Sequence, residues 1–193
     1  MARPREFDAD IALNKAMDLF WTKGYCATTT RDIVNTVGIG RQSIYNAFGG
    51  KESLFRRCLE HYEKSILDPR FTDLERKGAS KTEIVRFVAQ AVEFYDLQQP
   101  RKGCMLANTA VESSNSIPEA AAQAASYLDR LISGFSHAIS NASERRELKQ
   151  SLDHEAVARS LACTVLGMAV ASKSGSTREE LVDMASVALR PLY

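Results

Sequence analysis

The chain has 193 residues, of which 45% are hydrophobic and 25% are charged. That length suits one large domain or a small domain joined to a medium one, and the apolar fraction excludes a globally disordered chain. No apolar run approaches the roughly 18 residues needed to cross a bilayer, and no apolar stretch follows the basic residues of the N-terminus. We therefore expect a cytoplasmic protein with no membrane partner.

The charge and cysteine content bear on nucleic-acid binding, metal binding and disulfide formation. The net charge of +1 does not by itself indicate a nucleic-acid partner, although residues 28–57 hold five basic and two acidic side chains. The cysteines, at positions 26, 58, 104 and 163, form no C-x-x-C pair, and with the histidines at 61, 137 and 154 they form no set of ligands at metal-site spacing. We expect no metal site, no disulfide framework and no cofactor.

Apolar periodicity predicts an all-α fold of about nine helices, because no alternating strand pattern interrupts it. Three S-x-x-E boxes, beginning at Ser80, Ser116 and Ser176, indicate helix starts. The polar segment 68–80 contains Pro and Gly and is expected to join a small N-terminal unit to a larger one. The predicted helices span residues 8–23, 29–36, 40–47, 50–68, 80–97, 104–114, 118–141, 153–172 and 177–190.

Two short predicted helices, 29–36 and 40–47, flank Gly38, where a tight reversal needs a residue that tolerates positive φ. Apolar residues mark one side of each, and two short helices joined by such a turn form a helix-turn-helix. They cannot bury enough surface alone, so helix 8–23 is expected to brace them. The apolar residues expected at this junction are Ile11, Ala12, Ala16, Leu19, Phe20, Ile33, Val34, Val37, Ile44 and Phe48.

The outward face of helix 40–47 is rich in hydrogen-bonding side chains. A helix of this length fits the major groove, where its first residues reach base edges, and the start of helix 29–36 favours a phosphate. These residues by themselves leave two interpretations open, a DNA-reading face and an ordinary solvated helix face. The candidates are Thr29, Thr30 and Arg31 on the first helix and Arg41, Gln42, Ser43, Tyr45 and Asn46 on the second.

The stretch TTTRDIVNTVGIGRQSIYNAFGGKESLF, residues 28–55, resembles the DNA-binding signature of the TetR/AcrR-type transcriptional repressors. The resemblance covers roughly residues 7–60 and implies that the second and third helices contact DNA through the candidates above. It also implies that Lys51, opening the fourth helix, holds a phosphate. The chain departs from the family at Gly40, where many members have Ser, and at Arg41-Gln42, where Lys-Gly is frequent.

The resemblance implies a division into a helix-turn-helix DNA-binding domain, residues 1–50, and a helical effector-binding and dimerisation domain, residues 51–193. The fourth helix, 50–68, links the two. Helices 153–172 and 177–190 have small and apolar residues at helical spacing, which suits either a plain core or a four-helix homodimer interface. The resemblance favours the interface.

An effector pocket is expected among helices 50–68, 80–97, 104–114 and 118–141, although aromatic residues at helical spacing also form ordinary cores. The identity of the effector cannot be read from the sequence. The candidate lining residues are Tyr62, Ile66, Phe87, Phe94, Tyr95, Cys104, Met105, Asn108, Tyr127, Leu131 and Phe135.

Cys104 is a candidate reactive thiol, in a segment (RKGCMLANTAVE, residues 101–112) that resembles a helix in one branch of the family. It follows Arg101 and Lys102 and opens a predicted helix, and cations and a helix N-terminus both lower a thiol pKa. The alternative is a small buried hydrophobe. Cys58 and Cys163 lie on predicted apolar faces and are expected to be inert.

These observations predict an effector-responsive repressor that binds a palindromic double-stranded DNA operator as a homodimer. A small molecule, or modification of a thiol, would release it. The alternative is a helical enzyme or small-molecule carrier that does not bind DNA. The sequence offers no nucleophile–base pair, metal cluster or phosphate loop in support of that alternative, so we expect no catalytic residues.

Overall fold

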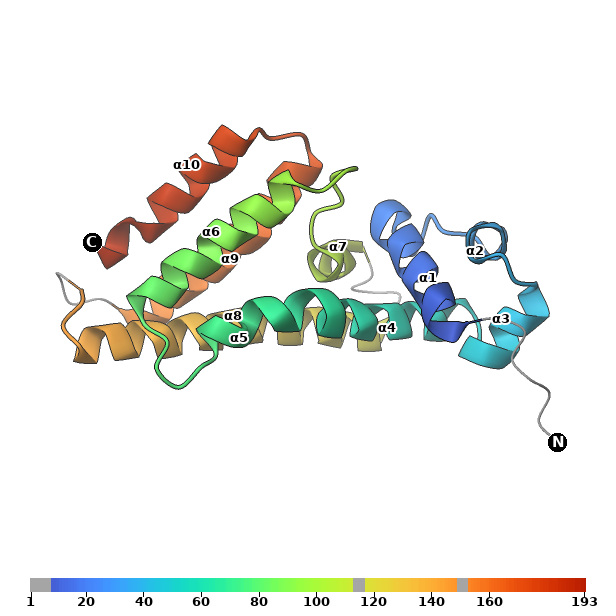
Figure 1. The fold of residues 1–193 in the computed structure, drawn as a ribbon, viewed down its shortest axis with the longest axis horizontal. Helices are drawn as coiled ribbons and strands as arrows, with labels where there is room; N and C mark the ends of the chain where they lie inside the picture. Colours follow the sequence, from blue (N-terminus) through green and yellow to red (C-terminus); the bar gives the residue numbers. More distant parts are fainter. Residues whose placement is uncertain (1–7, 113–116, 149–152) are drawn as a thin grey trace.

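The computed structural model describes residues 8–112, 117–148 and 153–193, and within these ranges all regular structure is helical. The molecule is elongated, with α1, α2 and α3 at one end and α6, α9 and α10 at the other (Figure 1). The expected all-α class is confirmed. The elements are α1 (Ala9–Lys23), α2 (Thr30–Val37), α3 (Arg41–Phe48), α4 (Lys51–Tyr62), the π-helical turn η1 (Glu63–Leu67), α5 (Asp68–Leu74), α6 (Lys81–Asp96), α7 (Met105–Glu112), α8 (Pro118–Glu144), α9 (His154–Lys173), α10 (Arg178–Leu189) and the 3-10 turn η2 (Arg190–Leu192).

The helix-turn-helix forms as the apolar pattern predicts. Ile33 and Val37 of α2 and Ile44 and Phe48 of α3 are buried, largely against α1 and α4. Gly38 ends α2 in the left-handed conformation, with φ of 81°. The bracing role expected of Ile11 is wrong, because its side chain is 55% exposed.

The helix predicted over 50–68 is longer than expected, and the predicted linker over 68–80 is wrong in its first half. α4, η1 and α5 follow one another without a break, so the helical path continues to Leu74. Leu67, Phe71 and Leu74 recur at steps of four and three and are buried, which supplies the packing that holds the extra turns. Pro69 lies in the first turn of α5, where a proline is tolerated.

The capping box predicted from the sequence is present at the start of α6, whereas the box at the start of α10 differs from the prediction. Ser80 and Glu83 form the predicted reciprocal box at the start of α6. At α10 the box is one residue later than predicted, between Thr177 and Glu180. The predicted box at Ser116 lies outside the described residues.

α8 is the longest helix, with 27 residues, and packs against α4, α5, α6, α7 and α9. Apolar residues at positions 121, 125, 128, 132, 135 and 139 recur at steps of four and three and predict a buried stripe there. Phe135 and Ile139 are buried as this pattern predicts, but most of the buried stripe lies beside it. Ala121 and Leu128 are half-buried, and Ala125 is exposed, because the helix is apolar on two adjacent stripes. The buried stripe contains Ala120, Ala124, Tyr127, Leu131, Phe135, Ala138, Ile139 and Ala142.

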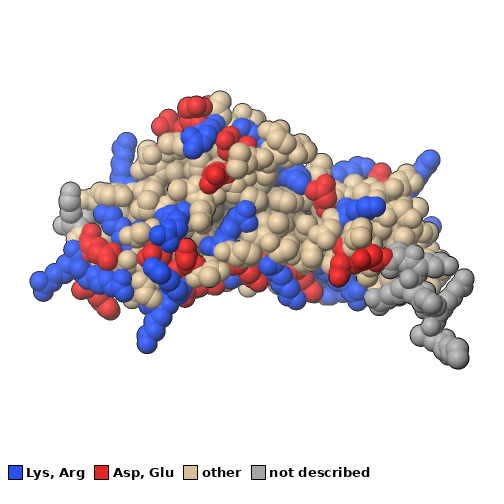
Figure 2. All heavy atoms as spheres, viewed as in Figure 1, with Lys and Arg blue, Asp and Glu red and all other residues tan. Residues whose placement is uncertain are grey.

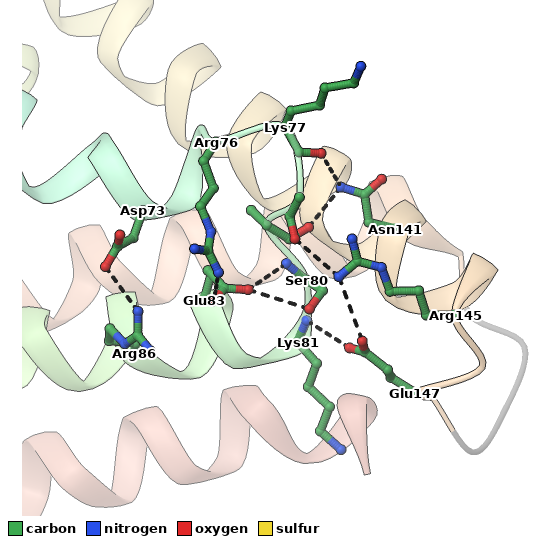
Figure 3. A network of polar contacts seen from close by, with 12 residues as sticks. Asp73, Arg76, Lys77, Ser80, Lys81, Glu83, Arg86, Asn141, Arg145 and Glu147 are labelled. Carbon is green, nitrogen blue, oxygen red and sulfur yellow. Dashed lines mark hydrogen bonds and ion pairs between the residues drawn. The ribbon is translucent and has the colours of Figure 1, made fainter.

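A polar network fixes the turn between α5 and α6 to the end of α8 (Figure 3). Asn141 Nδ2 donates to the carbonyl of Ala79 at 2.7 Å, and Arg145 Nη1 donates to that of Gly78 at 3.1 Å. Glu83 accepts from Arg76 Nη2 at 2.6 Å. This corner makes α5, α6 and α8 one rigid frame around the aromatic core.

α9 meets the length and hydropathy expected of a membrane-crossing helix, with a mean hydropathy of 1.3 over its most apolar window. In this fold it packs against α6, α7, α8 and α10. Leu161, Val165 and Met168 are buried there. These contacts are those of a core helix.

Candidate DNA-binding face and effector core

α3 presents the polar side chains that the sequence singled out. Arg41, Gln42, Tyr45 and Asn46 are exposed, and Tyr45 is 64% exposed despite its aromatic ring. Gln42 Nε2 donates to Asn46 Oδ1 at 2.9 Å, so these two amides, one turn apart, form a single hydrogen-bonded unit. Ser43 is half-buried at the edge of the same face. The arrangement offers a guanidinium, two amides and a phenol to a partner surface.

The start of α2 is fixed by Thr29, whose hydroxyl accepts from the Asp32 amide at 3.1 Å and donates to its carboxylate at 2.7 Å. The Asp32 carboxylate also accepts from Lys23 Nζ at 2.7 Å, and that hydrogen bond is the largest cause of its pKa lying well below the usual range. Because Asp32 already brings a negative charge to this helix start, a phosphate there would depend on the exposed Arg31 and the half-buried Thr30.

Lys51 opens α4 with its ammonium 4.1 Å from the centre of the Tyr25 ring. This cation–π contact holds a flexible side chain in one place. Figure 2 shows that acidic and basic groups are intermingled over the face drawn, as the net charge of +1 suggests. On this face attraction to a polyanion would come from individual cations, and residues 28–57, which include Lys51, hold five basic and two acidic side chains.

α7 ends in a carboxylate that holds the turn between α1 and α2. Glu112 Oε2 accepts from the Tyr25 amide at 3.1 Å, and Oε1 accepts from the Cys26 amide at 2.7 Å. Gly24 makes this approach possible, since a Cβ there would lie 2.5 Å from Glu112 Oε2. We name these two hydrogen bonds the Glu112 clamp, which no sequence pattern predicts.

The segment before α7 contacts α1 as well. Trp21 Nε1 donates to the Gly103 carbonyl at 3.2 Å, and the Lys102 ammonium pairs with Asp18. The Gln98 side chain accepts from the amides of Lys102 and Gly103, each at 2.8 Å. Both ends of α7 are thus tied to the DNA-binding end of the molecule, one through α1 and the other through the α1–α2 turn.

Most of the predicted effector residues belong to one aromatic core. Tyr62, Tyr95, Tyr127 and Cys104 are buried, and their titrating groups lie close enough to influence one another. Tyr62 Oη makes no ordinary hydrogen bond within the described residues. Four more of the predicted residues are buried: Phe87, Met105, Leu131 and Phe135. The other three, Ile66, Phe94 and Asn108, are half-buried. The side-chain amide of Asn108 donates to the carbonyl of Lys102.

This core contains a cavity of about 20 Å³, room for one water molecule. Of the predicted effector residues it brings together Phe87, Phe94, Tyr95 and Tyr127, and leaves the others outside its lining. Six further residues line the cavity: Leu67, Arg70, Phe71, Gln90, Ala91 and Val165. Arg70 and Phe71 were missed because 68–80 was expected to be a linker, and Val165 because a dimer interface was favoured for helix 153–172. Leu67, Gln90 and Ala91 lie on helices expected around the pocket but were not among the candidates.

Of the two interpretations of Cys104, the structure agrees with the small buried hydrophobe and not with the thiol of lowered pKa. Burial raises the pKa of the thiol, and hydrogen bonds from the α7 backbone lower it by less. The helix start therefore acts in the predicted direction, but desolvation of a fully buried sulfur outweighs it. The expectation for Cys163 is also corrected, because that cysteine is exposed, whereas Cys58 is buried as expected.

An exposed polar helix, in a helix-turn-helix tied to a helical core, defines a class of DNA-binding regulators. Residues 12–58 match the family model for bacterial regulatory proteins of the tetR family, and residues 81–186 match the tetracyclin repressor-like C-terminal domain. The chain belongs to the TetR family of transcriptional regulators. The interpretation as an enzyme is set aside, because the chain's relatives are regulators.

Its relatives include repressors. The chain is 31% identical to the HTH-type transcriptional repressor ComR of Escherichia coli (strain K12), over 97% of this chain and 90% of that protein. It is 28% identical to the uncharacterized HTH-type transcriptional regulator YezE of Bacillus subtilis (strain 168), over the full length of both. A cysteine-substituted form of the TetR family regulator CifR, solved with 26-base-pair operator DNA, is 26% identical over both full chains, with a TM-score of 0.88.

Proposed function

We propose that this protein is a homodimeric cytoplasmic repressor that binds a palindromic operator through α3 and is released by a small effector or by thiol modification. The observation that carries the proposal is the exposed set of Arg41, Gln42, Tyr45 and Asn46 on a helix whose opposite side is buried. Arg matches guanine edges and amide side chains match adenine edges in the major groove. CifR, which has a similar structure, is complexed with double-stranded operator DNA, and this supports DNA binding by the present chain.

The proposed domain boundary lies at residue 50, where Gly50 separates α3 from α4. α3 would enter the groove, Thr30 and Arg31 of α2 would lie at the phosphates, and Lys51 would hold a further phosphate. Thr29 would act through the α2 cap, because its hydroxyl already bonds Asp32. Base contacts would set the sequence preference, and phosphate contacts the register.

The proposed dimer forms through α9 and α10. Val170 and Val187 are 52% and 56% exposed, and a groove of about 700 Å³ between the two helices is lined by Cys163, Gly167 and Met184, among others. A second copy of the same helix pair would cover these apolar side chains. Two α3 helices would then face one duplex.

The effector would act on the aromatic core and reach α3 through α7. A ligand or adduct that moves the N-terminal end of α7 would disturb its contacts with Trp21 and the Glu112 clamp together. Cys104 is the candidate thiol for the alternative signal. Because that thiol is buried and its pKa is raised, modification would proceed through an opened conformation. Either route shifts the population away from the DNA-competent state.

A gel-shift experiment with the DNA flanking the gene tests the proposal. We expect sequence-specific retention by the full chain, lost in an Arg41→Ala, Gln42→Ala double variant and kept in Arg86→Ala, whose exposed side chain pairs with Asp73 on α5. If the double variant retains the same fragment as tightly as the wild type, the face assigned to DNA is wrong.

A further inference from the structure

Arg70 on α5 is a half-buried cation beside the aromatic cavity. The centre of its guanidinium lies 3.8 Å from the centre of the Phe94 ring, and one Nη donates to the Ile66 carbonyl in η1. Its neighbours are paired, Arg86 with Asp73 at 3.0 Å and Arg130 with Asp68 at 2.6 Å. In the described part of the chain Arg70 has no such carboxylate. Four of its five N–H groups therefore remain for another acceptor.

The guanidinium lies between an outer groove and the inner cavity. The groove has a volume of about 550 Å³ and shares Arg70, Gln90 and Phe94 with the cavity lining. On the inner side, Tyr95 and Tyr127 line the same cavity as Arg70. Burial raises the pKa values of both phenols, and the positive charge of Arg70 acts in the opposite direction.

The walls behind Arg70 suit an apolar body. Phe71, Phe87, Ala91 and Val165 line the inner cavity. The cavity now holds about one water, so a larger body fits only where these side chains have moved apart. η1 adjoins the site, and π-helical turns often occur at functional sites.

We propose that the effector is a small organic carboxylate, whose anionic group pairs with Arg70 while its apolar body enters the aromatic cavity. This inference rests on the proposed function of the core as the effector site. A guanidinium can hold a carboxylate through two parallel hydrogen bonds. Since the body requires a wider cavity, the carboxylate would bind the opened conformation better, which is the condition for a ligand to shift a population. Glu93 also lines the outer groove, and its charge opposes any anion there. The carboxylate therefore has to pair directly with Arg70, and a second anionic group without such a partner is disfavoured.

Calorimetric titration of the full chain with matched pairs tests this assignment. The probes are sodium benzoate against benzamide and sodium hexanoate against hexanamide, at one fixed ionic strength. We expect saturable binding of at least one carboxylate and at least tenfold weaker binding of its amide. Arg70→Gln should weaken the carboxylate about ten- to a hundredfold, the usual effect of losing hydrogen bonds to a charged group. Arg86→Gln, with the same charge change on α6, should stay within twofold.

Three results would overturn the proposal: no saturable binding by either carboxylate, equal binding of carboxylate and amide, or unchanged binding in Arg70→Gln. Melting curves of each variant establish that the chain is folded. The titration contains no DNA, so its failure is distinct from failure of the repressor. A wild-type chain that holds the operator but binds neither carboxylate refutes the anion assignment alone, and a wild-type chain that binds no operator refutes the proposed function.

Discussion

Arg41 and Lys51, two cations on the proposed DNA-binding face, are expected to make different contacts with DNA. Arg41 begins α3, where the first residues reach base edges, so Arg41→Ala should cost about 1–3 kcal/mol of binding and relax the preference at one base position. Lys51 is held over Tyr25 at the start of α4, where the family resemblance implies a phosphate contact. Lys51→Ala should weaken all sequences alike and reduce the salt slope by about one. Titrations against operator variants at several salt concentrations separate the two, and identical profiles would contradict the assignment.

The chemistry of Cys104 follows from its burial. Because the folded pKa is raised, the native thiol carries less thiolate at neutral pH than a free thiol. Iodoacetamide at pH 7 should therefore label it more slowly than a model thiol and more slowly than the exposed Cys26. Labelling of Cys104 at or above the model rate in the native protein would show that the sulfur is accessible and activated.

The raised pKa of Cys104 also predicts the direction in which the free energy of unfolding changes at alkaline pH. A thiol whose folded pKa is above its ordinary value of 9.0 contributes stability that is fully present below that value. The contribution is lost as the pH rises towards the folded pKa. Buried Tyr62, Tyr95 and Tyr127 act in the same direction, because burial raises their pKa values well above 10.0. The free energy of unfolding should fall above about pH 9, and replacing Cys104 with Ser should flatten the first part of that fall.

At the scale of elements, the Glu112 clamp is expected to hold the helix-turn-helix against α7. Gln at this position keeps one acceptor oxygen and turns an NH₂ group towards a backbone N–H, so one of the two hydrogen bonds is lost. In Glu112→Gln the amides of Tyr25 and Cys26 should exchange hydrogen about tenfold faster, corresponding to roughly 1.5 kcal/mol for a charged hydrogen bond. Glu119→Gln, at an exposed site on α8, is the control. Unchanged exchange in Glu112→Gln would show that the clamp is not formed in solution.

What the sequence predicted depends on the range of the interactions involved. The helix-turn-helix rests on local spacing around Gly38, so it could be predicted. α5 was missed because its polar residues and Pro69 resemble a linker, and only packing against the core reveals why Phe71 and Leu74 keep it helical. The stripe on α8 was displaced because two adjacent stripes are apolar.

The residues of the candidate site also fall into those that local sequence predicts and those that depend on contacts between distant elements. The polar face of α3 could be predicted from its own residues. Arg70 and Val165 could not, because they reach the cavity through contacts between elements far apart in the sequence. Local sequence left both interpretations of Cys104 open, because the helix start and flanking cations are local, whereas the burial that outweighs them is a property of the whole fold.

At the scale of the whole molecule, the account requires two copies of the chain. Val187 is 56% exposed on α10, and a charge there would be trapped in the proposed interface. Val187→Glu should convert a dimer of 21.3 kDa chains into monomers, as measured by analytical ultracentrifugation, and should weaken operator binding. Val111→Glu, at an 81% exposed position on α7, should leave the dimer intact. A dimer that tolerates Val187→Glu would place the interface elsewhere.

Two copies of α3, related by a twofold axis, are proposed to read one duplex. Selection of bound fragments from random DNA by the full chain checks this proposal. We expect an inverted repeat whose half-sites are about 34–36 Å apart or a multiple of that, with one base preference relaxed in Arg41→Ala. Selection that enriches no motif, or one unaltered by Arg41→Ala, would contradict it.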